Sequence, residues 1–386
     1  MIIDNGNSMN PTASFVGNPR RKAFADITNA NQGISSKSNN LKGKSAFILP
    51  TKREPTIRNV FGIQEPSNNT HAIATGSSCI PSDINVPTKA SGVFLGQSSS
   101  LQLGVPRYQQ SRRVTDIDER DKDDELAVSE YAADIYSHFK VQERTMTHVP
   151  PHFMAMQPQI TEEMRGVLVD WLVTLQFSFR LGSETLYLAV NLTDRYCSVN
   201  EVPRSTLQLV GATALFIASK YEEVSRALWV NDLVAICDNL YCRQEFVKME
   251  TQILSALGFK ISAPTAFSFL PRYLKAGHAD QNLAQLAAYV LEETLLSYPL
   301  LTYLPSQLAA ASVLIARNAT GRKPWSPTLL KYAEYREEQV VPVARAILKE
   351  KDHLPGITSV YKKYSSRRFG RVAEIDVSLS EIIGAW

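Results

Sequence analysis

The sequence predicts an all-α protein in which two similar helical blocks follow a long disordered region. Three observations carry this prediction. Residues 1–122 are rich in Ser, Asn, Gly, Pro and Thr and lack sustained apolar periodicity, so they cannot bury enough surface to offset the entropy of ordering. From Ser129 to about residue 365, apolar residues recur at helical spacing, and no run shows strand alternation. Finally, the two halves of this region carry similar segments in the same order.

The first block is predicted at residues 123–262, as an N-terminal helix followed by a bundle. The charged run Asp116–Glu125, which closes the preceding region, reads as a solvated lead-in to the first helix. Thr161 is placed to cap a helix that runs through Phe179, and Ser205 to cap the next small-residue helix. The last helix of the block is expected to stop near Gly258, because glycine readily takes the left-handed conformation that ends a helix.

The second block is predicted at residues 263–365. Its segment LAAASVLIARNAT corresponds to LVGATALFIASKYEE of the first block. Both segments are rich in Ala and other small residues, which let neighbouring helices approach closely. Each is therefore expected to be the central helix of a five-helix bundle. Residues 366–386 read as a C-terminal tail, and a short helix that packs back on the second block is the alternative.

Composition excludes several classes of protein. The net charge of +3 over 386 residues gives no chain-wide basic surface for nucleic acid. The four cysteines are scattered without a C-x-x-C pair, which argues against a zinc site or a disulfide framework and for a reducing compartment. The N-terminus lacks a secretory signal, and the longest apolar stretch, 207–218, is too short to span a bilayer. We therefore expect no direct nucleic-acid partner and no membrane partner.

A catalytic site is also hard to assemble from the sequence. None of the six histidines lies in an H-E-x-x-H motif, and none lies near a G-x-S-x-G turn. A phosphate-binding glycine loop of either common type is missing as well. The sequence thus predicts no catalytic residue, no metal, no cofactor and no enzymatic activity.

Two charged residues stand out in the apolar helix MRGVLVDWLVTLQFSF, at Arg165 and Asp170. Buried charges need partners. Asp194 on the following helix is a candidate partner for Arg165, and an internal structural ion pair is favoured over a binding role. Lys220 and Glu250, taken alone, suggest only a cation at a helix C-terminus and an exposed helix position.

Three segments carry a family resemblance: MRGVLVDWL, SETLYLAVNLTDRYCS and LVGATALFIASKYEEV. In this order and spacing they resemble the cyclin box of A/B-type mitotic cyclins. PTAFSFLPRY and LLSYPLLTYLPSQLAAASVLIAR resemble the C-terminal cyclin fold of the same family. The resemblance covers residues 129–350. It implies tandem five-helix cyclin folds and a non-catalytic subunit that binds and activates a cyclin-dependent protein kinase at the G2/M transition.

The resemblance also gives roles to single residues. It matches five positions typical of the box, which are Arg165, Asp194, Leu209, Lys220 and Glu250. It implies that Lys220 and Glu250 bind the kinase, and that Arg165 and Asp194 form the structural ion pair. After Lys220 the run KYEEVSRALWVND departs from the Y-P-P turn common in the family and is one residue longer.

A substrate-docking patch is implied on the first box helix. The matching residues are Met164, Val167, Leu168, Trp171 and Gln208. Substrates and inhibitors with short R-x-L-type motifs are the expected ligands. Here the motif is M-R-G-V-L in place of the usual M-R-A-I-L, so a weakened or reshaped groove is expected. The competing interpretation is that these side chains complete the core.

The segment RKAFADITN resembles a destruction box, with Arg21, Phe24, Ile27 and Asn29 at its key positions. It implies recognition by the anaphase-promoting ubiquitin ligase and degradation. Phenylalanine in place of the usual leucine resembles B3-type cyclins. The family role favours the nucleus as location, with the cytoplasm as the alternative.

Two alternative functions remain open from the sequence. One is a transcription-associated protein of the same duplicated fold, which is not expected to carry a destruction box. The other is a helical scaffold without a kinase partner. Binding to a cyclin-dependent kinase separates the main prediction from the scaffold.

Overall fold

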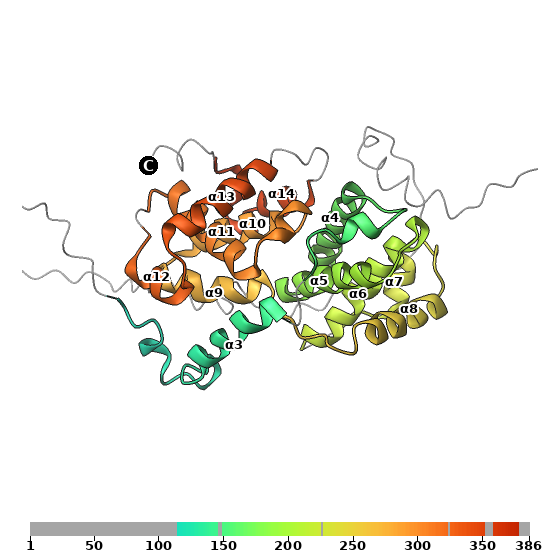
Figure 1. Cartoon of the computed structure of the whole chain (residues 1–386), viewed down its shortest axis with the longest axis horizontal. Coiled ribbons are helices and arrows are strands. Elements are labelled where there is room, and N and C mark those ends of the chain that lie inside the picture. The colour runs from blue at the N-terminus through green and yellow to red at the C-terminus, as the bar shows by residue number, and fades with distance from the viewer. Residues whose placement is uncertain (1–113, 146–148, 225–226, 323–324, 352–357, 378–386) are drawn as a thin grey trace, which may run out of the picture.

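The structure is a computed structural model that describes residues 114–145, 149–224, 227–322, 325–351 and 358–377. Within these ranges all regular structure is helical and no strand occurs, which confirms the all-α prediction (Figure 1). The predicted destruction box and the rest of residues 1–113 lie outside the described ranges.

Six helices form the N-terminal part. The helix α3 comes first, and five helices of the first repeat follow it. Their bounds are α3 Ala132–Thr145, α4 Glu162–Phe179, α5 Ser183–Val199, α6 Leu207–Glu222, α7 Val230–Ile236 and α8 Arg243–Ala256.

The second repeat also has five helices, and a short helix α14 follows them. Their bounds are α9 Ala266–Ala276, α10 Gln281–Glu293, α11 Pro305–Ala319, α12 Pro327–Ala333, α13 Glu337–Lys351 and α14 Ser359–Tyr364. The two repeats lie side by side along the long axis of the molecule, and α3 runs beneath α9 (Figure 1). The predicted pair of five-helix bundles with an N-terminal helix is confirmed.

Local sequence signals set most of the helix ends. The Thr161 hydroxyl accepts the backbone N–H of Met164 at 3.3 Å and caps α4 as expected. Gly258 follows α8 with a φ of +56°, which a glycine adopts without strain. The predicted cap at Ser205 is wrong, because Ser205 lies in a 3-10 turn before α6. Its carbonyl accepts the Tyr241 hydroxyl at 2.7 Å instead.

The helices α6 and α11 are central, as their small residues predict. The helix α6 contacts α4, α5, α7 and α8, and α11 contacts α9, α10 and α13. Every residue of α6 from Leu207 to Ser219 is buried. At Gly211 a Cβ atom would lie 2.8 Å from a methyl group of Leu168. Glycine at this position therefore sets the close approach of α4 and α6.

The two repeats are joined at several places. The helix α5 contacts α9 directly. The helix α14 lies against both α4 of the first repeat and α10 of the second. Val372 and Ala373, beyond α14, are also buried, and the turn that contains them contacts α10. In its described part, the segment 366–386 forms two 3-10 turns, Arg367–Phe369 and Val372–Glu374, rather than the short helix given as the alternative. The helix that packs on both repeats is α14, which lies within the predicted second block.

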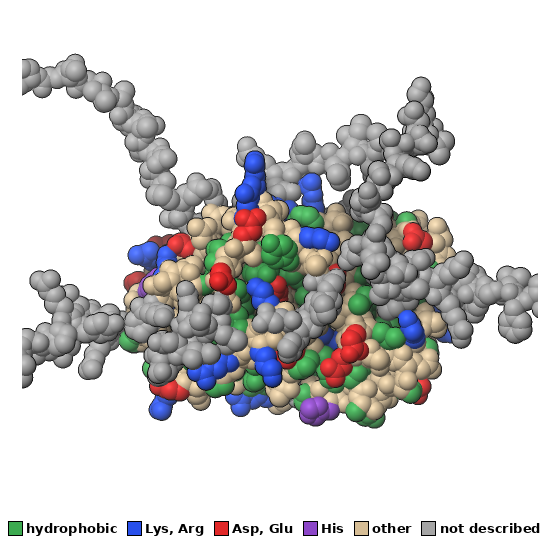
Figure 2. Space-filling model, turned by 90° about the horizontal axis from the view of Figure 1, so that it is seen from above, with side chains coloured by type: hydrophobic (Ala, Val, Ile, Leu, Met, Phe, Trp, Pro, Cys, Tyr) green, Lys and Arg blue, Asp and Glu red, His purple; other side chains and the backbone are tan. Residues whose placement is uncertain are grey.

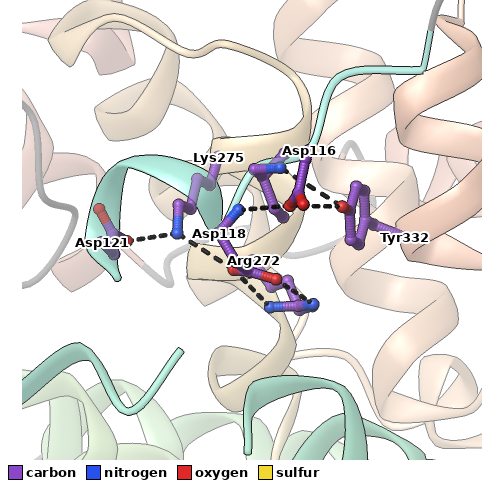
Figure 3. Close-up of polar contacts among 7 residues, drawn as sticks. Asp116, Asp118, Asp121, Arg272, Lys275 and Tyr332 are labelled. Carbon is purple, nitrogen blue, oxygen red and sulfur yellow. Dashed lines mark hydrogen bonds and ion pairs between the residues drawn. The ribbon is translucent and has the colours of Figure 1, made fainter. Parts of the chain in front are cut away.

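The prediction that Asp116–Glu125 is a solvated lead-in holds for exposed residues such as Glu119 and Lys122 but is wrong for Asp118 and Asp121. Asp118 accepts two hydrogen bonds from the Arg272 guanidinium, at 3.0 and 3.2 Å, and the Lys275 ammonium bridges Asp118 and Asp121 (Figure 3). Ile117, which directly precedes Asp118, is buried. These carboxylates find cations about 150 residues away in the sequence, and they hold the lead-in on α9.

Candidate functional site

The predicted kinase-binding residues Lys220 and Glu250 lie together and form an ion pair. Lys220 sits in the last turn of α6, and Glu250 lies in the middle of α8. The Lys220 side chain is 42% exposed and the Glu250 side chain 17%. The Lys220 ammonium also lies 4.2 Å from the centre of the Phe216 ring. The pair is thus fixed at the surface and supported by an aromatic side chain from below.

Exposed apolar residues lie on the same two helices as this pair or just beyond them, and sequence reasoning missed them. Val247 lies three residues before Glu250 on α8 and is exposed, as is Tyr221, which follows Lys220. Phe259, just beyond α8, is 68% exposed. Large apolar side chains grouped at a surface mark an interaction site. Helical spacing of apolar residues on α8 was the available signal, but periodicity alone does not say which face the rest of the bundle covers.

A groove of about 450 Å³ opens beside Lys220, between the end of α6 and the start of α7. Its lining is mostly apolar, with two cations at the rim. The lining residues are Phe216, Lys220, Ala227, Leu228, Trp229, Val230, Asn231 and Arg243. The groove and the exposed side chains together form the candidate kinase-facing surface, which we define as Lys220, Glu250, Tyr221, Val247, Phe259 and this groove lining.

The predicted substrate-docking residues divide into two groups. Met164, Val167 and Trp171 are partly exposed on α4. Leu168 and Gln208 are buried beneath them. The Gln208 Oε1 atom has no hydrogen-bond partner among the described residues. Leu209, the remaining box position, belongs to the core.

Arg165 and Asp194 form a buried, bidentate ion pair. The Arg165 Nε and Nη2 atoms each lie 2.7 Å from a carboxylate oxygen of Asp194. Both side chains are only 3% exposed. Burial opposes the charge on the guanidinium, but the Asp194 carboxylate outweighs it and raises the pKa of Arg165. The Arg165 Nη1 atom also donates to the Leu295 carbonyl at 2.9 Å, so the pair ties the first repeat to the second.

The C-terminal helix α14 is bound to α4 at both of its ends. Asp170 accepts the backbone N–H of Ser359 at 2.8 Å and its hydroxyl at 2.7 Å. At the other end, the buried Lys363 ammonium lies 2.6 Å from Glu292 and 3.0 Å from Gln176. The sequence marked Asp170 as a charge in need of a partner, but nothing in it pointed to residue 359.

The described ranges lack a candidate metal site and a candidate membrane span. They contain no group of three or more His, Cys, Asp or Glu side chains able to hold a metal ion. None of their helices is long and apolar enough to cross a membrane. On the part of the face in Figure 2 that the described residues form, basic and acidic side chains are interspersed rather than separated.

Comparison with known proteins points to one family. Residues 134–262 match the family model "Cyclin, N-terminal domain", and residues 264–378 match "Cyclin, C-terminal domain". A viral cyclin from herpesvirus saimiri has a similar fold, with a TM-score of 0.51 and 22% sequence identity. That likeness covers 59% of this chain and 99% of the viral protein.

Curated relatives are mitotic cyclins of the B type. Cyclin-B2-1 of Arabidopsis thaliana is 40% identical over 268 residues, which is 69% of this chain and 62% of the relative. G2/mitotic-specific cyclin-1 of Medicago sativa subsp. varia is 42% identical over 264 residues, 68% of this chain and 61% of the relative. The matched region thus spans about three fifths of the length of these relatives. The resemblance to B3-type cyclins stays a prediction.

Proposed function

This chain belongs to the cyclin family, and from that premise we propose that it binds a cyclin-dependent protein kinase and activates it in mitosis. The names of its relatives, such as G2/mitotic-specific cyclin-1, support the mitotic role. The observation that carries the proposal is the Lys220–Glu250 pair among exposed apolar side chains. In this role the chain is a regulatory subunit, and the catalytic groups belong to the kinase.

The chemistry of the kinase-facing surface suits this role. Its exposed apolar side chains, among them Phe259 and Val247, provide contact area whose burial favours association. The Lys220–Glu250 pair supplies both charges at one place, which fixes the register of a partner. When the kinase binds at this surface, the cyclin pushes one helix of the kinase inward. That movement restores the lysine–glutamate pair of the kinase that positions the ATP phosphates.

The test is binding to, and activation of, purified cyclin-dependent kinases, with histone phosphorylation as readout. Lys220→Ala combined with Glu250→Ala should lower activation at least tenfold and leave the helix content unchanged. The exposed ion pair of Lys122 and Glu119 offers a matched control, because it lies on the lead-in. The corresponding double alanine variant should activate like the wild type. Equal activation by both double variants would remove the assigned role of Lys220 and Glu250, and absence of kinase binding would remove the proposed function.

Substrate selection belongs to the same proposal. Met164, Val167 and Trp171 give a partly exposed apolar strip on α4. This strip favours an extended peptide that carries an R-x-L-type motif, from a substrate or an inhibitor. Trp171→Ala should slow phosphorylation of a substrate with this motif and spare the same substrate without it. Equal slowing of both substrates argues against docking.

Degradation and location complete the proposal. We assign Arg21, Phe24, Ile27 and Asn29 to a destruction box read by the anaphase-promoting ubiquitin ligase, and we place the protein in the nucleus. Replacing Arg21 and Phe24 by Ala should lengthen the half-life of the protein at mitotic exit, and unchanged turnover would refute the assignment. A fluorescent fusion that stays outside the nucleus throughout the cell cycle would refute the location.

A further inference from the structure

We propose that Trp229 is an anchor of the kinase contact, which gives this chain a preference among kinases. The indole would pack against an apolar side chain that the kinase inserts into the groove beside Lys220. This inference rests on the proposed function. It goes beyond it by naming a residue in a stretch where the sequence departs from the common family turn.

The position of Trp229 is held by its neighbours in the chain. The preceding residue, Leu228, is buried, and its backbone N–H donates to the Ser219 hydroxyl of α6 at 3.1 Å. The Trp229 backbone N–H donates to the Asp232 carboxylate at 3.3 Å, at the start of α7. The indole therefore projects from a backbone that is tied to two helices. An anchor held in place before binding costs less entropy to bury.

The exposure of Trp229 is unusual for its type. Its side chain is 66% exposed, although an indole carries one of the largest apolar surfaces among the amino acids. Tryptophan is enriched among the few residues that supply most of the energy of a protein interface. The groove that it lines contains Phe216, Leu228 and Val230, so an incoming side chain meets apolar groups on several sides.

The charges at the rim specify the partner further. Lys220 and Arg243 both line the groove, and Glu250 pairs with Lys220. No ion pair of Arg243 occurs among the described residues, and its side chain is exposed. Of the two cations in the lining, Lys220 is thus paired with Glu250, and Arg243 is left without an ion pair among the described residues. The chemistry that fits is an apolar side chain next to a carboxylate on the kinase, so that the carboxylate meets Arg243 while the apolar group enters the groove.

Affinity measurements on the full chain test this inference. Wild type, Trp229→Ala and Trp229→Phe would be titrated against a panel of purified cyclin-dependent kinases. Trp229→Ala should weaken binding to the preferred kinase about 30-fold, the size expected for an interface hot spot. Trp229→Phe should retain part of the affinity. Tyr361→Ala is the matched control, because Tyr361 is 47% exposed but lies on α14, and it should bind like the wild type.

A second readout does not depend on whether the alanine variant folds. The difference in fluorescence between wild type and Trp229→Phe reports the indole at position 229, and its emission should shift to shorter wavelength when the kinase binds. If wild type binds while Trp229→Ala binds within twofold of it and the emission does not shift, this inference is wrong and the proposed function stands. If wild type binds no kinase of the panel, the proposed function fails and this inference falls with it.

Discussion

The buried Arg165–Asp194 pair allows a stability prediction with a worked magnitude. Arg165→Met removes the guanidinium and leaves the Asp194 carboxylate, 3% exposed, without its cation. An uncompensated buried charge costs about 3–5 kcal/mol. The Leu295 carbonyl also loses the donor that lies 2.9 Å away, which adds about 1 kcal/mol. We therefore expect Arg165→Met to lower the free energy of unfolding by about 4–6 kcal/mol.

A double variant separates the charge from the packing. Arg165→Met combined with Asp194→Val replaces both ions by apolar groups, and such replacements of buried pairs are often neutral. The double variant should therefore be more stable than Arg165→Met alone. It should keep a loss of about 1 kcal/mol, because the Leu295 carbonyl still lacks a donor.

Urea unfolding followed by far-ultraviolet circular dichroism measures both variants, with midpoint and slope fitted together. A loss of less than about 1 kcal/mol in Arg165→Met would refute the reasoning, because it would mean that Asp194 finds water or another cation. A double variant no more stable than the single one would show that packing, and not the stranded charge, sets the cost.

Two further predictions concern the core of the first repeat. Gly211→Ala should lower the free energy of unfolding by about 1–2 kcal/mol in the same urea assay, because the added methyl would lie 2.8 Å from Leu168. This overpacking outweighs the gain in helix propensity, and a variant more stable than the wild type would contradict the prediction. Burial raises the pKa of the Cys197 and Cys237 thiols to about 12, so at pH 8 iodoacetamide should modify the exposed Cys242 and reach the other two only in urea. Peptide mass spectrometry after timed labelling checks this, and equal labelling of the three in the native protein would refute it.

Sequence reasoning succeeded where the signal is local or periodic. The cap at Thr161 depends on contacts within four residues. Gly258, in the left-handed conformation, marks the C-terminal end of α8. The small residues around Gly211 mark α6 as central because only short side chains permit its close approach to α4. The sequence also named Asp194 as the candidate partner of Arg165, since Arg165 falls where burial is expected and Asp194 lies on the next helix.

The remaining features depend on tertiary placement, which local patterns do not encode. A charged run such as Asp116–Glu125 looks like any solvated segment. Its contact with Arg272 and Lys275 arises only once α9 is folded. The exposure of Trp229 and Phe259 has the same origin, because an apolar residue is exposed or buried according to which helices cover it. Lys220 and Glu250 were therefore predicted from the family resemblance, whereas the exposure of Trp229 and Phe259 is seen only in the structure.

The polar contacts of α4 also bear on how the chain presents its surfaces. Arg165 of this helix bonds to the second repeat through Leu295, and Asp170 and Gln176 bond to α14. Two of these three α4 side chains are buried, and so is the Lys363 ammonium that Gln176 meets, so rotating α4 away would strand polar groups in the core. The helix is therefore held by both repeats at once. Its partly exposed side chains form a fixed strip rather than an adjustable one, and a peptide that binds there must fit the surface as it stands.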